Sequence, residues 1–553
     1  MRQPLLVAVP LVLSLVGCAP SAPATAPAPA ARPAAGAPSR AALATPPVPA
    51  WEEARKDWHL LDAVQDSVQG VGLRRAEREL LAGRTPARTV VVAVIDGGVD
   101  TAHADLRANL WRNPKETVNG KDDDGDGLAD DTWGWNYLGG ADGRNVDRET
   151  LELTREYVRC TAPGSTVADS ANRSYCAAVT ADFTEQRTKA ERNMAQMAQI
   201  STMYDGAKQV LQGAMGGTAL TPESVKALVP ANETVRAAQD LWLRFSSNGI
   251  TEQEIVEGVE QVRGQAQYGL NPALDARSVV GDDPRNPAQT RYGNRDVTGP
   301  DASHGSHVAG IIGAARGAEG IDGIASAVQL LAVRAVPRGD ERDKDVALAI
   351  RYAVDHGAHI INMSFGKGYS PEKSLVDDAV RYADAKGVLL VHAAGNDGQN
   401  LATGENFPKA QYLGGGEAAN WIEVGASSWR GGNELAASFS NYGRQQVDLF
   451  APGVDITSTV PGGGYKANSG TSMAAPVVSG VAALLMSYFP KLTAAEVKRI
   501  LLETSAKYPE LMVARPGATP EELVRFGELS RTGGVVDAYA AVQAALAMGA
   551  KAR

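Results

Sequence analysis

One candidate catalytic residue is a serine in a stretch rich in small residues. Ser472 stands in SGTSMAAPVVSGVAALL, where the residues that follow it have the pattern of a buried helix. A serine at a helix start commonly caps the helix by accepting a hydrogen bond from a free backbone N–H group. The same N–H groups and the helix dipole stabilise negative charge, which would favour a nucleophile. This stretch alone favours a helix-capping role for Ser472 over a role as nucleophile. Other residues must therefore decide between the two roles.

Three further polar residues stand at the ends of predicted elements. Asp96 ends the apolar run TVVVAVID, His304 opens the helix-like HGSHVAGIIGA, and Asn396 ends the strand-like LLVHAAGN. Each has an ordinary structural interpretation as a turn or cap residue. His304 and His307 could form half of a metal site, but the seven histidines offer no HExxH-like partner. We therefore do not expect a metal at these histidines.

The elements that must position these residues alternate along the chain. Apolar runs typical of strands covered on both faces are followed by segments with helical spacing, and Thr493 and Glu496 form a capping box. This alternation predicts an α/β fold, a doubly wound and mostly parallel sheet, with functional groups at the carboxyl ends of strands. We expect strands near 89–96, 328–336, 359–366, 388–396, 421–428 and 447–453, and helices near 343–358, 374–387, 472–485 and 493–506.

Taken together, Asp96, His304 and Ser472 form an Asp, a His and a Ser in that chain order, which is the order found in subtilisin. The chain also contains VAVIDGGVDTAHADL, HGSHVAG, NMSFG, AAGN and GTSMAAP. With these motifs it resembles the subtilisin-like serine peptidases, in a bacterial lipoprotein form. The resemblance covers about 51–548 apart from one insertion, and it implies a subtilisin-like fold and serine endopeptidase activity on proteins or peptides.

The resemblance also implies a role for each matched residue. Ser472 would be the nucleophile, because a hydroxyl needs a neighbouring base, and His304 would be that base. Asp96 would fix the tautomer of His304 and stabilise its charged form. The Asn396 side chain and the Ser472 backbone N–H would bind the oxyanion. No cofactor is needed for this chemistry. The implied substrate-binding residues are Ser364, Phe365 and Gly366.

Two positions depart from the family pattern. Gly97 stands where a Ser or Thr usually follows the Asp, which removes a hydroxyl that could support the carboxylate. Ser306 replaces the usual Thr between the two histidines and keeps the hydroxyl. Neither change predicts an inactive protein.

An acidic loop, NGKDDDGDGLADDTWGW, resembles the first half of an EF-hand. Carboxylates at alternate positions are followed by a glycine, as in a Ca²⁺-binding loop. The second half does not match, because Trp133 stands where the bidentate Glu would be. Like charges packed so densely repel one another unless a cation binds. We expect a structural Ca²⁺ site rather than a solvated acidic turn, with ligands from Asp122, Asp124, Asp126, Asp130 and Asp131.

The N-terminus has the pattern of a lipoprotein signal. Arg2 precedes a short apolar segment that ends in LVGC, which resembles a lipobox and predicts a signal peptide over 1–17 and lipidation of Cys18. The alternative is an ordinary secretory signal. Residues 18–50 are rich in Ala and Pro and predict a tether. Ala19, in place of an Asp, predicts an exported protein anchored in the outer membrane by its lipid, on the periplasmic or surface side.

Residues 144–286 predict a helical insertion within a peptidase domain that spans 89–548. Its helical patterns include a methionine-rich stripe, Met194, Met197, Ile200 and Met203, that we expect to pack between helices. In an oxidising compartment, Cys160 and Cys176 are close enough to form a disulfide. Residues 51–88 predict a segment that packs against the peptidase domain.

The charge of the chain excludes some partners. Its formal net charge is -10 and no basic block stands out, which argues against a nucleic-acid partner. The main alternative to an enzyme is a peptide-binding lipoprotein, inactive or weakly active, that keeps the fold. Another α/β hydrolase would show a G-x-S-x-G motif and the order Ser, Asp, His, and neither occurs around Ser472.

Overall fold

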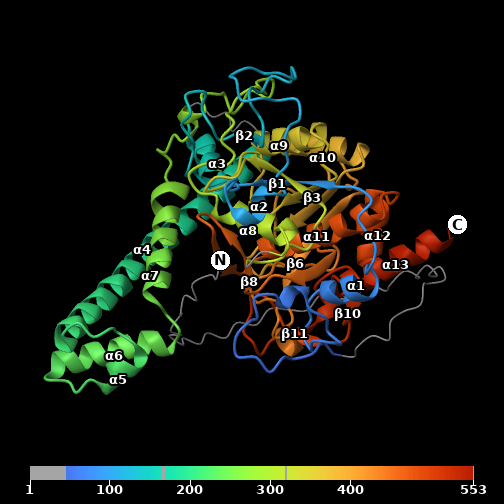
Figure 1. Ribbon diagram of the computed structural model, residues 1–553. Coiled ribbons are helices and arrows are strands. Elements are labelled where there is room, and N and C mark those ends of the chain that lie inside the picture. The colour runs from blue at the N-terminus through green and yellow to red at the C-terminus, as the bar shows by residue number, and fades with distance from the viewer. Residues whose placement is uncertain (1–44, 164–169, 318–319, 552–553) are drawn as a thin grey trace, which may run out of the picture.

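The computed structural model describes residues 45–163, 170–317 and 320–551. The main body is built on a nine-stranded sheet with the order β10-β13-β7-β6-β5-β4-β1-β3-β2 (Figure 1). All neighbours are parallel except β10 and β13. The strands are β1 (Val90–Asp96), β2 (Gly134–Asn136), β3 (Val328–Arg334), β4 (Ile360–Met363), β5 (Leu389–Ala393), β6 (Trp421–Ser427), β7 (Leu449–Pro452), β10 (Ala506–Lys507) and β13 (Gly534–Val535).

Helices cover both faces of this sheet, which explains why its strands are almost uniformly apolar. Along β1, Val92 and Val94 face one core and Ala93 and Ile95 face the other. The first core is covered by α1 (Leu73–Glu79), α8 (Ser303–Gly313), α11 (Thr471–Tyr488), α12 (Ala494–Thr504) and α13 (Ala538–Lys551). The second is covered by α9 (Asp343–Asp355) and α10 (Lys373–Ala385). This arrangement confirms the predicted fold class.

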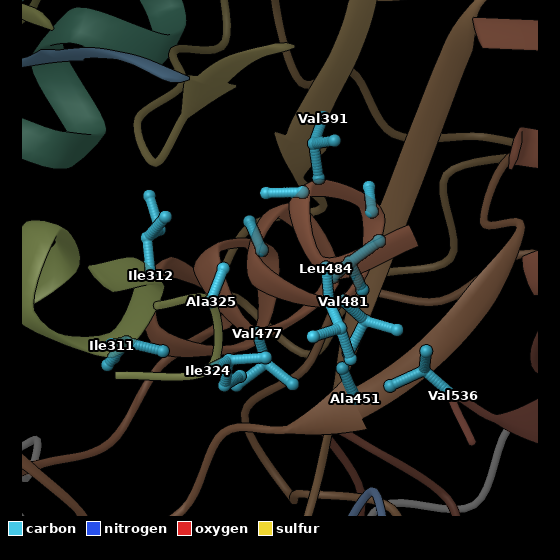
Figure 2. Close-up of a cluster of buried hydrophobic side chains, with 14 of the residues drawn as sticks. Ile311, Ile312, Ile324, Ala325, Val391, Ala451, Val477, Val481, Leu484 and Val536 are labelled. Atoms are coloured by element: carbon cyan, nitrogen blue, oxygen red, sulfur yellow. The ribbon is translucent and has the colours of Figure 1, made fainter. Parts of the chain in front are cut away.

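The centre of the first core is α11. Val477, Val481 and Leu484 pack with Ile324 and Val391 in one continuous cluster (Figure 2). By length and composition α11 is the one helix of the described residues that could cross a membrane, but it is buried almost throughout within the body. It therefore serves as the core helix that carries Ser472 in its first turn.

Two hairpins and several short elements complete the body. The segment before β1 contributes Trp58 and Leu73 to the first core, and the Trp58 indole N–H donates to the Val454 carbonyl over 3.1 Å. The hairpins are β8 (Ile456–Val460) with β9 (Gly464–Asn468), and β11 (Met512–Ala514) with β12 (Leu523–Arg525). The remaining short elements of the body are α2 (Ala104–Arg107) and the 3-10 turns Trp58–Leu60, Gly432–Glu434 and Phe526–Glu528. The π turn Gln265–Gly269 and the 3-10 turn Arg277–Val279 lie between β2 and α8.

Between β2 and α8 the chain forms a helical insertion. Its long helix projects from the body with a second helix alongside and two shorter helices at the far end (Figure 1). We call this projection the arm and define it as α4 to α7. The helices are α3 (Glu152–Thr161), which lies at the base, and α4 (Ser170–Met215), α5 (Pro222–Ala227), α6 (Glu233–Ser247) and α7 (Glu252–Gly264).

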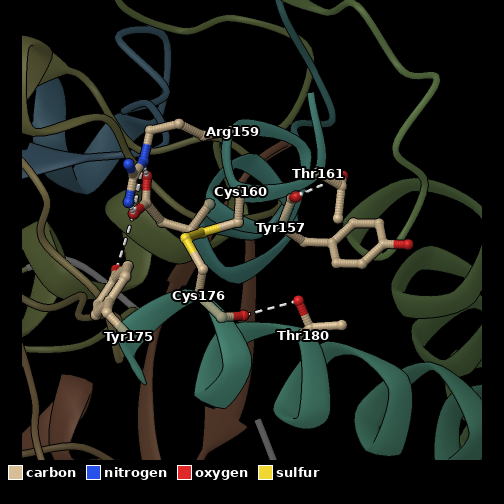
Figure 3. Close-up of a disulfide and its surroundings, with 8 residues drawn as sticks. Tyr157, Arg159, Cys160, Thr161, Tyr175, Cys176 and Thr180 are labelled. Atoms are coloured by element: carbon tan, nitrogen blue, oxygen red, sulfur yellow. Dashed lines mark hydrogen bonds and ion pairs between the residues drawn. A yellow bond between two sulfur atoms is a disulfide. The ribbon is translucent and has the colours of Figure 1, made fainter. Parts of the chain in front are cut away.

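A disulfide joins the base of the insertion to the arm. Cys160 of α3 and Cys176 of α4 form the predicted bond across a separation of 16 residues (Figure 3). Beside it, Arg159 and Tyr175 both bind the Glu156 carboxylate. The disulfide and the hydrogen bond from the Tyr175 hydroxyl to Glu156 therefore fix the start of α4 against α3.

The packing stripe of α4 differs from the predicted one. Met197 is buried, but Met203 is 40% exposed. The next buried residue after Met197 is Tyr204. Five buried positions recur every seven residues, namely Phe183, Ala190, Met197, Tyr204 and Leu211, and Val179 and Ala207 are buried as well. A seven-residue repeat is typical of helices that pack lengthwise along a partner, and it leaves Met203 one position outside the seam.

Candidate active site

Asp96 and His304 meet at the carboxyl end of β1. His304 Nδ1 lies 2.9 Å from both carboxylate oxygens of Asp96, whose side chain is 4% exposed against 30% for His304. Because Nδ1 faces the carboxylate, the other ring nitrogen, Nε2, is the one that can accept a proton from a nucleophile. The arrangement can therefore orient and stabilise a general base.

A close backbone approach makes this pairing possible. A Cβ placed on Gly305 would lie 2.1 Å from the Gly98 carbonyl oxygen and 3.1 Å from Asp96 Oδ1. Gly98 itself has a φ of 145°, a conformation that side chains strongly disfavour. Glycine at both positions lets the start of α8 rest directly on the turn after Asp96.

The two departures from the family pattern have local explanations. The Gly97 backbone N–H donates to Asp96 Oδ1 over 2.7 Å, so the carboxylate keeps a donor although the residue has no hydroxyl. The Ser306 hydroxyl accepts from the Asp100 N–H over 2.8 Å and thereby ties α8 to the loop after Asp96.

Ser472 lies in the first turn of α11 and contacts Ser364, the residue that follows β4. Its hydroxyl donates to the Ser364 carbonyl over 3.1 Å, and the Ser364 hydroxyl donates to the Ser472 carbonyl over 2.9 Å. Asn362 in turn donates to the Ser364 hydroxyl over 2.9 Å and accepts from Ser479 over 2.8 Å. A chain of hydrogen bonds thus fixes the substrate-binding candidate Ser364 against the helix that carries Ser472.

Asn396 follows β5 and reaches the same helix start. Its Oδ1 accepts from the Thr471 N–H over 2.8 Å and from the Thr471 hydroxyl over 3.0 Å, which orients the amide nitrogen. A Cβ placed on Gly470 would lie 3.6 Å from both Asn396 Nδ2 and the Ser472 backbone nitrogen. The two predicted oxyanion donors therefore lie on the same side of Gly470.

His307, the second histidine of HGSHVAG, binds a backbone carbonyl. Its Nε2 lies 2.9 Å from the Lys466 carbonyl, and burial lowers the pKa of the ring to about 3. The ring is therefore neutral at ordinary pH and donates to a backbone oxygen. It ties α8 to the β8–β9 hairpin.

Glu116 holds the acidic loop together, although it stands outside the motif. Its carboxylate accepts from the N–H groups of Asp123 (2.6 Å), Asp124 (3.0 Å) and Asp130 (2.9 Å). Carboxylate oxygens of Glu116, Asp122 and Asp124 lie within 4.8 Å of one another. By donor type this group fits a hard cation such as Ca²⁺.

A second group shares Asp124 and includes a distant histidine. Asp124, Asp126 and His356 offer ligand atoms within 4.8 Å of one another. Asp131 lies behind this group, where it accepts from the Tyr352 hydroxyl over 2.6 Å, and burial raises its pKa to about 6. The structure thus gathers Asp122, Asp124 and Asp126 with Glu116 and His356, and it buries Asp131 beside them.

Asp130 is turned away from both groups. Its carboxylate accepts from the N–H groups of Asn119 and Gly120 and forms an ion pair with Arg295 at 3.2 Å. Sequence reasoning included Asp130 because it lies in the acidic run, and it missed Glu116 and His356 because they lie outside that run. The predicted lipidation site, Cys18, lies outside the described residues.

Comparisons with known proteins find serine proteinases among the proteins that this chain resembles. The chain is 43% identical over 187 residues to the thermophilic serine proteinase of Bacillus sp. (strain AK1), covering 34% of this chain and 43% of that protein. It is 39% identical over 210 residues to subtilisin E of Bacillus subtilis (strain 168), covering 37% of this chain and 51% of that protein. The chain thus spans about half the length of the curated relatives that it matches.

A solved cold-adapted subtilisin-like serine proteinase is 29% identical, with a TM-score of 0.34 over 44% of this chain and 76% of the other. The model of the subtilase family matches residues 87–527, which include Asp96, His304, Asn396 and Ser472. This match covers most of the chain and confirms the predicted resemblance to subtilisin-like serine peptidases. The chain belongs to the subtilase family.

Proposed function

We propose that this chain is an exported serine endopeptidase that hydrolyses peptide bonds through an acyl-enzyme on Ser472. The observation that supports this most is the Asp96–His304 pair, because His304 lies on α8 and α8 packs against α11, the helix that bears Ser472 in its first turn. A purely structural histidine would not need a buried carboxylate on Nδ1 and a half-exposed ring. Family membership supports the same reaction class.

In the proposed reaction the Ser472 hydroxyl turns from the Ser364 carbonyl toward His304 Nε2. As Ser472 Oγ attacks the substrate carbonyl carbon, its proton passes to Nε2, and Asp96 stabilises the resulting imidazolium. Asn396 Nδ2 and the Ser472 N–H stabilise the oxyanion. His304 then protonates the leaving amine, and a water molecule, deprotonated by the same nitrogen, hydrolyses the ester.

Cleavage of an unfolded protein tests this proposal. The purified chain is expected to release peptides that mass spectrometry can identify, and Ser472→Ala, which removes only one oxygen atom, is expected to release none. Equal peptide patterns from both proteins would mean that a contaminant cleaves the substrate. Peptide binding without release of fragments would favour the alternative of a peptide-binding lipoprotein.

We also propose that lipidated Cys18 anchors the protein in the outer membrane and that the acidic loop binds a structural Ca²⁺. The lipobox-like LVGC and the Ala/Pro-rich stretch after it support the anchor. Cys18→Ser is expected to release the protein in soluble form or to leave its precursor unprocessed, as fractionation would show. Unchanged membrane association of that variant would contradict the anchor.

A further inference from the structure

A histidine and a glutamate form a buried pair directly behind the substrate-binding candidates. His392 on β5 and Glu423 on β6 are register neighbours in the sheet. Their side chains are 0% and 8% exposed, and His392 Nδ1 lies 2.9 and 3.0 Å from the two Glu423 oxygens. A buried ionisable pair is costly unless both groups are fully hydrogen-bonded.

The other partners of the pair determine where its protons lie. His392 Nε2 lies 2.8 Å from the Phe365 carbonyl, which can only accept, so Nε2 carries a proton. Glu423 Oε2 also accepts from the Trp421 indole N–H over 2.8 Å. A second proton is shared between His392 Nδ1 and the Glu423 carboxylate. Whichever of these two groups carries it, His392 Nε2–H donates to the Phe365 carbonyl.

Phe365 connects this pair to the reacting serine. The residue before it, Ser364, exchanges two hydrogen bonds with Ser472. The segment Ser364–Gly366 is therefore held at one residue by the α11 start and at the next by His392. Neither histidine nor glutamate reaches the reacting atoms.

We infer that His392 is a positioning residue, which holds the Phe365 carbonyl so that the Ser364–Gly366 segment presents its backbone to an extended peptide substrate. Glu423 keeps the His392 ring in place through Nδ1. The inference rests on the proposed peptidase function, because it assigns the pair an effect on substrate binding. A purely structural pair would affect the stability of the fold and leave binding unchanged in any variant that folds.

Two amide variants separate these roles. In His392→Gln the amide nitrogen can reach the position of Nε2 and donate to Phe365. In His392→Asn the shorter amide matches Nδ1 and cannot reach Phe365. Both variants are neutral and polar, so they share the loss of the ring.

The expected result is a split between the two variants. His392→Asn is expected to raise KM for an extended peptide about 5–10-fold with little change in kcat, which corresponds to the loss of one net hydrogen bond. His392→Gln is expected to stay within about twofold of the parent. Melting curves identify the variants that fold. Equal KM values in folded Asn and Gln variants would overturn the inference.

Glu423→Gln provides a second test if the His392 variants do not fold. Its amide can donate to Nδ1 and accept from Trp421, so Nε2–H still donates to Phe365 and KM is expected to be unchanged. A five-fold or larger rise in KM in this variant would contradict the assigned order of contacts.

Peptide binding separates failure of this inference from failure of the proposed function. In the Ser472→Ala background, fluorescence titration with the same peptide is expected to show weaker binding for His392→Asn than for His392→Gln. If the parent cleaves nothing but this difference persists, the proposed function is wrong and the positioning role stands. If the parent cleaves and the two variants bind equally, the positioning role is wrong.

Discussion

The body and the inserted arm are built in opposite ways. In α11 every residue except Ser472 and Tyr488 is buried, so the helix is surrounded by the core and its start is fixed. In α4 one seven-residue seam is buried and the other positions are largely exposed. The difference indicates that the body can hold side chains at fixed distances, whereas the arm leaves most of its surface to solvent.

The base of the insertion is buried like the body, but the side chains buried there are charged. Lys367, which directly follows the substrate-binding candidates, lies 2.7 Å from Glu152 of α3 and 2.8 Å from Asp343 of α9. Farther out, α7 contacts the body through Lys466 and the half-exposed Glu257 at 2.8 Å. The insertion is therefore anchored firmly at its base and more weakly along the arm.

The largest expected effect is on stability at the base. Lys367→Met leaves Glu152 and Asp343 buried without this cation, and the free energy of unfolding is expected to fall by about 3–5 kcal/mol. The matched change on the arm, Lys466→Met, is expected to cost at most about 1 kcal/mol because both partners are solvated. Denaturant titration of both variants measures the difference. Similar losses would remove the distinction between base and arm.

Within the body, the next effect is catalytic. Asn396→Leu keeps the side-chain size and removes one oxyanion donor. We expect kcat to fall about 10²–10³-fold with little change in KM, the magnitude measured for such a donor in subtilisin itself. Steady-state kinetics with a peptide substrate would show this. A raised KM with intact kcat would make Asn396 a substrate-binding residue instead.

The acidic loop belongs to the body and should respond to calcium. If Ca²⁺ binds the folded protein at 100 times its Kd, linkage predicts about 2.7 kcal/mol of stabilisation, which chelation would remove. Asp124→Ala is expected to abolish most of this response, because Asp124 belongs to both ligand groups. Asp130→Asn serves as the control and should keep the response. Melting curves that do not differ between chelator and calcium would leave an acidic turn without a cation.

The smallest expected effect is on substrate range. The arm can be removed by replacing residues 162–267 with a glycine linker in a Cys160→Ser background, which keeps the buried ion pairs at the base. Because α7 reaches the hairpin before Ser472, the shortened protein is expected to cleave large proteins faster relative to short peptides. An unchanged ratio of the two rates would place the role of the arm elsewhere, for example in docking a partner.

A feature of the structure could be predicted when its signal came from residues that lie close together in the sequence. The fold class could be predicted because apolar strands alternate with helical segments along the chain. The catalytic roles of Asp96, His304, Asn396 and Ser472 come from the family resemblance of short motifs and stay predictions. The disulfide could be predicted because its two cysteines are close in the chain. These signals need only a few neighbouring residues.

Signals that depend on distant residues were missed. His356 lies more than 200 positions from the acidic loop in the sequence, and no motif marks its approach. His392 and Glu423 sit inside strands that read as apolar, so only the register of β5 and β6 shows that they meet. Met203 was expected to pack, but the pitch of a long helix places Tyr204 in the seam instead.

The most direct test of the central claim is the site of covalent labelling. An organophosphorus serine reagent is expected to form one adduct, located on Ser472 by mass spectrometry. Ser472→Ala should lose it, and His304→Ala should form it far more slowly because the hydroxyl then lacks its base. No adduct on the folded protein, an adduct on another serine, or an unchanged labelling rate in His304→Ala would contradict the assignment of Ser472 as a nucleophile activated by His304.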